Sequence, residues 1–114
     1  MSTLATSGKM LTINKYVDMP SSTISNFKKY YFVYVLESMR DAKRYVGFTV
    51  DLRRRFEEHC QGRVISTYHR RPLRLIYFEA CLSENDARRR EKYLKTSGVR
   101  IFLAKRLQQY YLNI

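Results

Sequence analysis

The sequence predicts a small α/β (α+β) domain in which helices flank a three-stranded antiparallel sheet. Two runs rich in aromatic and β-branched residues, at residues 31–36 and 44–49, are separated by a short polar segment, which is typical of a β-hairpin. A third apolar run, at residues 73–80, supplies a further strand. Apolar residues recur with helical spacing after the hairpin and again after the third run, so helices are expected to cover the sheet.

The length of the chain limits the number of domains that it can form, and its charge indicates which class of partner it binds. With 114 residues, 45% of them hydrophobic, the chain can bury one modest core, so a single domain and by default a monomer are expected. The 22 Lys and Arg residues exceed the 10 Asp and Glu residues, which favours a polyanionic partner and nucleic acid before others. An apolar run of membrane-spanning length is missing, which excludes a membrane-spanning role.

Residues 1–29 differ in composition from the rest of the chain. They are rich in Ser and Thr, keep no helical or strand period, and carry four lysines against one acid, Asp18. We expect a flexible basic N-terminal arm here and a folded domain at residues 30–114. The arm has neither the continuous apolar core of a signal peptide nor the arginines of a mitochondrial leader, so neither is expected.

The two cysteines, Cys60 and Cys81, indicate free thiols and a reducing, cytoplasmic location. Their neighbours lack the spacing of a metal-binding knuckle. A zinc site made by these cysteines with His59 and His69 stays open as an alternative.

The expected hairpin places two tyrosines within reach of each other. Counting alternate residues puts Tyr34 on one face of the first strand, and Tyr45 lies across the turn on the second. The turn at residues 38–42 has no Asn-Gly pair, so a loop of four or five residues is expected. Gly47 marks a position where another group approaches the backbone closely. Such tyrosine pairs more often serve packing than chemistry, so the pair alone defines no site.

A helix is expected at residues 51–61, with an oxygen of Asp51 at its start and Gly62 as its stop. Its expected buried stripe has four-residue spacing and consists of Leu52, Phe56 and Cys60.

Helical phase separates the polar residues of this helix. Arg55 and His59 lie together along one border of the stripe, Arg53 lies near the other, and Arg54 points away. Residues 63–71 then form a loop with basic and hydroxyl side chains, which suits phosphate oxygens. The expected nucleic-acid contacts are Arg53, Arg63, Ser66, Thr67, His69, Arg70 and Arg71.

The third strand, at residues 73–80, is almost continuously apolar, which predicts that both of its faces are covered. A second helix follows from a near capping box at residues 83–86 to about Thr96, with Gly98 as a break. A last helix is expected from Val99; its packing residues are Ile101, Phe102, Leu103, Leu107 and Tyr110 or Tyr111.

Glu91 is a carboxylate in the apolar stripe of the second helix, beside Ala87 and Leu94. Burying it without a partner would cost several kcal/mol, on the order of a lost solvation shell, so it needs a cation. An ion pair with Arg90, Lys95 or an arginine of another element satisfies this need, and so does a metal ion.

Several of these motifs together resemble the GIY-YIG nuclease domain. Val33-Tyr34 ends a strand, Tyr45-Val46-Gly47 follows eleven residues later, and Arg55 comes ten residues after Tyr45. The likeness extends over roughly residues 30–107 and is greatest to the small bacterial stand-alone proteins of this superfamily. The further motifs that carry it are Leu52-Arg53-Arg54-Arg55, His59, Ser66-Thr67, Arg71-Pro72, Leu75-Ile76-Tyr77-Phe78-Glu79-Ala80 and Ala87-Arg88-Arg89-Arg90-Glu91.

The resemblance implies an endonuclease that hydrolyses DNA, in repair or processing, with one Mg²⁺ or Mn²⁺ ion. It implies that Tyr34 and Tyr45 are the signature tyrosines, that Arg55 supports the phosphate, and that Glu91 is the single metal ligand. His59 matches a position that is His or Tyr in the family. In the expected chemistry Tyr34 is the general base, Tyr45 orients the water and His59 assists proton transfer.

A non-catalytic module that binds DNA or RNA on the same fold is the alternative function. Phe48 stands where some excision-repair members of the superfamily have lysine. The late asparagine of several members has no clear counterpart, since Asn113 lies close to the end of the chain. These departures favour the binding module, whereas four retained residues together favour the enzyme: Tyr34, Tyr45, Arg55 and Glu91.

Overall fold

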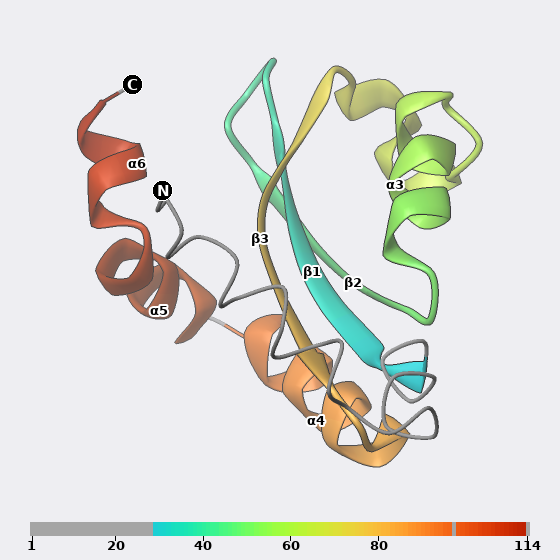
Figure 1. Ribbon diagram of the computed structural model, residues 1–114. Helices are drawn as coiled ribbons and strands as arrows, with labels where there is room; N and C mark the ends of the chain where they lie inside the picture. Colours follow the sequence, from blue (N-terminus) through green and yellow to red (C-terminus); the bar gives the residue numbers. More distant parts are fainter. Residues whose placement is uncertain (1–28, 97, 114) are drawn as a thin grey trace, which may run out of the picture. The chain divides into compact units, whose positions relative to one another are not determined.

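A computed structural model describes residues 29–96 and 98–113, and residues Tyr31–Ile114 form one compact unit (Figure 1). The arm expected at residues 1–29 lies, except for its last residue, outside the described residues. The elements are β1 (Tyr31–Ser38), β2 (Arg44–Thr49), α3 (Leu52–Cys60), the 3₁₀ helix η2 (Ile65–Arg70), β3 (Leu73–Cys81), α4 (Glu84–Leu94), α5 (Gly98–Arg106) and α6 (Gln108–Leu112).

The three strands form an antiparallel sheet in the order β2-β1-β3, as the sequence predicts. Strand β1 is central, and its residues from Val33 to Ser38 are buried. The hairpin loop closes with a hydrogen bond from the Ser38 N–H to the Lys43 carbonyl (2.9 Å), and Ala42 adopts a φ of 61°. The expected loop of four or five residues is therefore confirmed.

The prediction that β3 is covered on both faces is wrong. Because β3 is an edge strand, its residues are half-buried or exposed, and 50% of the Phe78 surface remains accessible. A continuous apolar run indicates a buried strand only when neighbouring elements pack on both of its faces.

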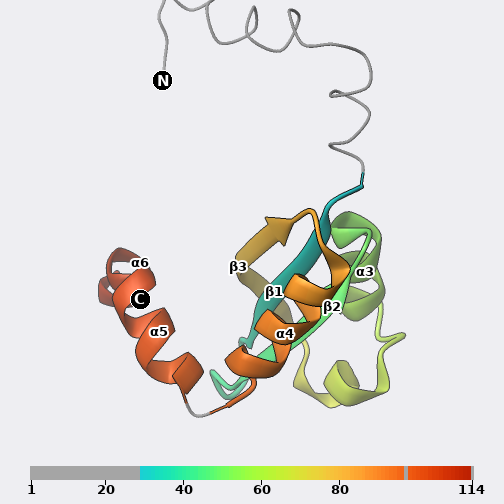
Figure 2. The same ribbon diagram turned by 90° about the horizontal axis from the view of Figure 1, so that it is seen from below.

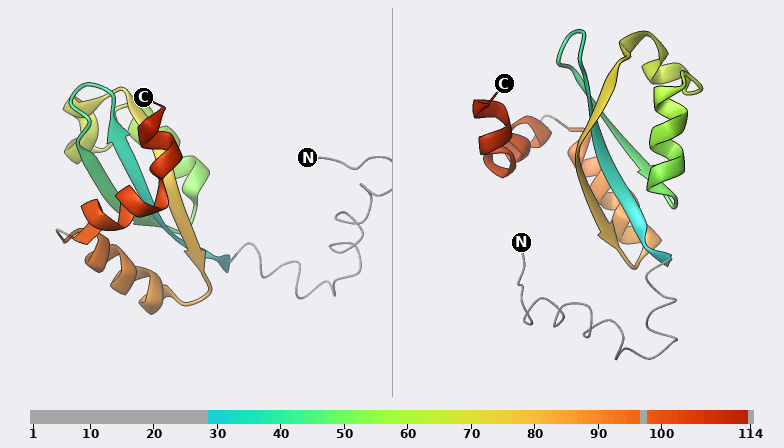
Figure 3. Two further views of the ribbon diagram at one scale, coloured as in Figure 1. Left: turned by 90° about the vertical axis from the view of Figure 1, so that its left-hand side faces the viewer. Right: turned by 45° about the horizontal axis from the view of Figure 1, so that its top comes forward.

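Alternating side chains divide the sheet between two layers of helices. Val33 and Val35 of β1 face the apolar core, which also contains buried residues of β2, α4 and α5: Val46, Ala87, Leu94 and Leu103. The opposite face carries α3, and Figures 1 and 3 show α3 on one side of the sheet with α5 and α6 on the other. The side chains of β1 that point toward α3 include Tyr34.

Helix α3 starts where the sequence predicts but is rotated about its axis. The Asp51 carboxylate accepts from the Arg54 N–H at its N-terminus (3.1 Å), and Gly62 follows its end with a φ of 80°. His59 is its buried residue, whereas Cys60, expected in the buried stripe, is exposed. The rotation brings the His59 ring to the Tyr34 hydroxyl. This hydrogen bond sets which side of the helix faces the sheet, so His59 is buried where apolar spacing predicted Cys60.

The C-terminal part of the chain forms two helices where one was expected. The backbone of Leu107 leaves the helical region (φ −117°, ψ 39°) and separates α5 from α6. Leu103 is buried as predicted, but Ile101 is exposed, so the prediction that Ile101 packs on the sheet is wrong. Helix α4 ends at Leu94, slightly before the predicted end, and α5 begins at Gly98.

Helices long and apolar enough to cross a bilayer are absent from residues 29–96 and 98–113.

A substitution at Gly47 tests the close approach of the Tyr34 ring to the backbone of β2. A Cβ at this position would overlap the hydroxyl of Tyr34 and lie 2.8 Å from its Cε1, and the buried ring has no space to withdraw. We expect Gly47→Ala to lower the free energy of unfolding by about 1–3 kcal/mol, as overpacking does. Urea denaturation measures this difference.

Gly98→Ala is the matched control, because a Cβ there meets its nearest atoms at 3.5 Å. It should change stability by less than about 0.5 kcal/mol. Equal effects of the two substitutions would contradict the close approach of Tyr34 to Gly47.

Candidate active site

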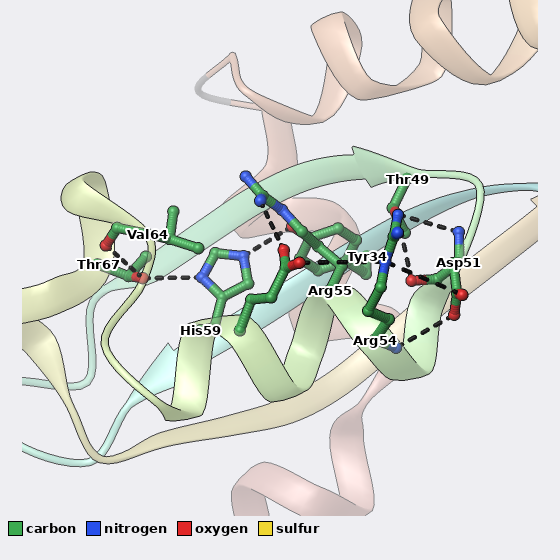
Figure 4. Close-up of polar contacts among 9 residues, drawn as sticks. Tyr34, Thr49, Asp51, Arg54, Arg55, His59, Val64 and Thr67 are labelled. Carbon is green, nitrogen blue, oxygen red and sulfur yellow. Dashed lines mark hydrogen bonds and ion pairs between the residues drawn. The ribbon is translucent and has the colours of Figure 1, made fainter.

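Two strands and one helix bring three aromatic side chains together on the α3 face of the sheet: Tyr34, Tyr45 and His59. Figure 4 shows two of them, Tyr34 and His59. Tyr34 pairs with Gly47 in the strand register, and Tyr45 lies diagonally across, with the two phenol rings 6.3 Å apart. The His59 ring lies 5.6 Å from the Tyr34 ring and 5.1 Å from the Tyr45 ring. The sequence-predicted tyrosine pair therefore exists, and the predicted histidine joins it.

A chain of hydrogen bonds runs through His59. Its Nε2 lies 2.8 Å from the Tyr34 hydroxyl and its Nδ1 lies 2.7 Å from the Thr67 hydroxyl. The Thr67 hydroxyl also reaches the Val64 carbonyl (3.5 Å), which can only accept a hydrogen bond. One tautomer satisfies all these groups: Nδ1–H donates to Thr67, and Nε2 accepts from the Tyr34 hydroxyl.

Burial sets the protonation states along this chain. Burial raises the pKa of Tyr34 to about 12, while a hydrogen bond from Arg55 opposes that change. Burial, followed by the charge of Arg55, lowers the pKa of His59 to about 4. At neutral pH Tyr34 is therefore a protonated phenol that donates a hydrogen bond to a neutral imidazole.

Arg54 and Arg55 separate as helical phase predicts. The Arg54 side chain is 64% exposed and lies 4.0 Å from carboxylate oxygens of Asp51 and of Glu58. Arg55 is 37% exposed; it donates to Glu58 at 3.0 Å and also bonds the Tyr34 hydroxyl. Only Arg55 thus borders the aromatic cluster, with donors that suit phosphoryl oxygens.

Glu91 on α4 is half-buried, with 18% of its side chain exposed, and pairs with Lys95 at 2.9 Å. Arg90 instead binds Glu79 on β3, at 2.8–3.0 Å. The negative charge of Glu91 is also among the effects that raise the pKa of Tyr34, after burial and Tyr45, so this carboxylate acts on the cluster electrostatically. Within residues 29–96 and 98–113 its one salt-bridge partner is 54% exposed, which leaves the carboxylate open to a competing cation.

A multi-residue metal centre is absent from the described parts of the chain: no three His, Cys, Asp or Glu side chains there converge. The zinc site considered for Cys60, Cys81, His59 and His69 is therefore wrong. His59 already uses both ring nitrogens in hydrogen bonds, and Cys60 is exposed. A single carboxylate completed by water still suits Mg²⁺, which keeps several waters when it binds proteins.

The loop expected at residues 63–71 contains the helix η2, and its predicted nucleic-acid contacts divide into two groups. Thr67 is fully buried against His59, so its assignment to nucleic acid is wrong, and it positions the imidazole instead. The other predicted contacts are exposed or half-buried, and they stay predictions: Arg53, Arg63, Ser66, His69, Arg70 and Arg71.

Sequence reasoning missed Tyr68. It is 46% exposed on η2, and the Arg71 guanidinium lies 4.5 Å above its ring. An accessible aromatic ring within a basic segment can stack on a nucleobase. Its position between two predicted nucleic-acid contacts was the available signal.

The chain is similar to a known protein family and to several proteins of other organisms. The GIY-YIG catalytic domain family matches residues 30–100. A UPF0213 protein of Pseudomonas aeruginosa is 40% identical over 73 residues, which are 63% of this chain and 69% of that protein. A UPF0213 protein of Streptococcus pneumoniae is 40% identical over 65 residues, 56% of this chain and 65% of that protein. The solution NMR structure of a UPF0213 protein from Bacillus halodurans is 32% identical, with a TM-score of 0.44, and the match covers 67% of this chain and 83% of that one.

The lowered pKa of His59 predicts a pH dependence of stability. The unfolded chain binds a proton at His59 below about pH 6.5, whereas the folded chain does so only below about 4. The contribution of the neutral imidazole is therefore complete above pH 6.5 and is lost as the pH falls toward 4. We expect His59→Gln, which cannot titrate, to remove on the order of 3 kcal/mol of pH dependence from this window.

Denaturant melts at several pH values measure the effect. His69→Gln is the control, because His69 is exposed and this variant should keep the wild-type slope. If His59→Gln kept that slope as well, His59 would not be buried in its neutral form.

Proposed function

Because the chain belongs to the GIY-YIG catalytic domain family, we propose that it is a metal-dependent endonuclease that hydrolyses DNA phosphodiester bonds, in DNA repair or processing. The observation that carries the proposal is the hydrogen-bonded chain from Tyr34 through His59 to Thr67. A fully buried imidazole bonded at both nitrogens is more than sheet packing requires, since an apolar side chain would fill the space without needing partners. It gives the phenol a group that can accept its proton.

The pKa of Tyr34 changes the expected role of this residue. A phenol with a pKa of about 12 is not a free base at neutral pH, so Tyr34 works as a relay. As a water oxygen bonds to phosphorus, one water proton moves to the Tyr34 oxygen and the phenol proton moves to His59 Nε2. The bond between phosphorus and the leaving oxygen breaks, and that oxygen takes a proton from solvent. Thr67 holds the imidazole tautomer that accepts.

Arg55 and Glu91 supply the charge that this chemistry needs. The Arg55 guanidinium borders Tyr34 and donates to the phosphoryl oxygens, which carry the developing charge. Glu91 is the residue that holds a divalent cation, since its carboxylate is half-buried and, in the described part of the chain, forms an ion pair only with an exposed lysine. A bound Mg²⁺ or Mn²⁺ ion supplies stabilisation of the negative charge on the leaving oxygen. Tyr45 orients the attacking water beside them.

Phe48, which replaces a lysine found in some family members, does not enter this cluster. Its ring stacks on Tyr31 at 6.2 Å on the opposite face of the sheet, and the Arg88 guanidinium lies 4.0 Å above it. The departure at this position therefore leaves the groups around Tyr34 in place.

Glu91→Gln tests the proposal directly. It removes the charge but keeps the shape, so cleavage of supercoiled and branched DNA with Mg²⁺ should fall below detection, while binding of DNA in chelator should persist. Because Glu91 pairs only with an exposed lysine, stability should change by less than about 1 kcal/mol.

Glu84→Gln is the matched control, since Glu84 makes a similar surface pair with Arg88 at 2.9 Å on the same helix and should leave cleavage unchanged. Wild-type protein that binds DNA but cleaves none of these substrates with Mg²⁺ or Mn²⁺ would exclude the enzyme and leave the non-catalytic binding module.

Arg55 and Arg54 provide a second test, because neighbouring residues of the same chemistry face different surroundings. Arg55→Ala should lower the cleavage rate by about two to three orders of magnitude, as removal of one transition-state donor does. Arg54→Ala should weaken binding by at most about one phosphate contact and leave turnover at saturating DNA nearly intact. Single-turnover kinetics compare the two, and equal losses would contradict this arrangement of the site.

A further inference from the structure

A basic cavity is lined by residues from the turn between β1 and β2, from the start of β2, from the end of η2 and from the start of α5. Figure 2 shows α5 and the three strands seen from below. The volume of the cavity is 730 Å³. Cations from three separate segments line it, and two aliphatic side chains of α5 complete it: Lys43, Arg44, Arg70, Arg100, Val99 and Ile101. Of these residues the sequence analysis had singled out only Arg70 as a nucleic-acid contact.

The charge of this cavity is largely uncompensated. Arg44 donates to the Tyr111 hydroxyl at 3.2 Å, but the side chains of Lys43, Arg70 and Arg100 make no hydrogen bond or ion pair within residues 29–96 and 98–113. The lining residues include no acid. Asp41 is the nearby carboxylate. The hydrogen bond from the Lys43 backbone N–H (2.9 Å), followed by smaller effects that include the charges of Arg70 and Lys43, lowers its pKa, so Asp41 offsets part of this positive charge. An anion entering the cavity still meets several cations at once.

Two hydrogen bonds fix two of the cavity's walls, the β1–β2 turn and the end of η2, to each other. The Ser38 hydroxyl donates to the Arg70 carbonyl at 2.7 Å, and the Arg40 guanidinium donates to the His69 carbonyl at 2.9 Å. These bonds join the β1–β2 turn to the end of η2. A ligand that binds this part of the cavity therefore loses little affinity to ordering of the turn and of η2.

The position of β2 connects the cavity to the catalytic face. Arg44 and Tyr45 are neighbours in this strand, so their side chains point to opposite faces of the sheet. Because β2 is an edge strand, a polymer that contacts Tyr45 can continue around the edge to Arg44 without crossing another strand.

We propose that this cavity binds a single-stranded arm of the DNA whose cleavage site lies at Tyr34 and Tyr45, an inference that rests on the proposed function. A double helix, with a major groove alone about 12 Å wide, is too bulky to enter. A single strand fits, with its phosphates on the cations and its bases against Val99 and Ile101. The substrate class is therefore DNA with a flap, an overhang or a branch, in preference to intact duplex.

The test compares binding of a labelled single strand, a blunt duplex and a duplex with a single-stranded arm by the full chain in chelator, measured by fluorescence anisotropy. The variant Lys43→Ala with Arg100→Ala removes two exposed cations that form no ion pair with the described residues. Affinity for the single strand and for the armed duplex should fall by about tenfold or more, and the salt dependence should decrease by about 0.7 per lost contact. Affinity for the blunt duplex should change by less than about twofold.

The control removes two exposed cations outside the cavity, Arg89 and Lys105, by substitution with Ala, and should weaken binding of all three DNAs by less than about twofold. A single charge reversal, Arg100→Glu, should reproduce the selective loss. Equal losses for duplex and single strand, or no loss for the single strand, would overturn the proposal. The binding assay contains chelator and no metal, so its result can be interpreted even if the protein does not cleave DNA. Conversely, if the cavity proposal failed, cleavage of blunt duplex by the variant with Lys43→Ala and Arg100→Ala would still support the proposed function.

Discussion

A neutral histidine enclosed between α3 and the sheet is the constraint on which the candidate site depends. His59 is fully buried away from bulk solvent, so its ring nitrogens need hydrogen-bond partners in the interior. Tyr34 and Thr67 provide them at 2.8 and 2.7 Å. This requirement fixes the rotation of α3, anchors η2 through Thr67 and draws the Tyr34 ring over Gly47. The phenol, the imidazole and the hydroxyl are thus arranged by the same interaction that packs the helix on the sheet.

Much of the fold could be predicted because it is specified locally. The bounds of β2, the helix start at Asp51 and the Ser83 cap of α4 each follow from a few adjacent residues. The exposure of β3 and the break between α5 and α6 did not follow, because both depend on strand order and on packing between distant segments. Apolar content alone does not reveal which strand is central.

The candidate site shows the same division between local and distant information. The resemblance to the GIY-YIG family pointed to Tyr34, Tyr45 and Arg55, and helical phase distinguished Arg55 from Arg54. The role of Thr67 escaped prediction, because a hydroxyl in a basic segment looks like a phosphate contact until its burial is known. The cations of the cavity beside β2 come from three segments that are distant in the sequence, so no single sequence motif contains them.

The pairing of Tyr34 with Gly47 also bears on how the chain finds its fold. Strand register between β1 and β2 is a discrete choice, and a slip of one residue would place Val46 or Phe48 opposite the tyrosine ring. Either side chain would occupy the space that the ring needs, because even a single added carbon at Gly47 collides with it. Misregistered hairpins are therefore disfavoured because the Tyr34 ring needs the space above Gly47. The correct strand register and the assembly of the candidate site thus depend on the same contact.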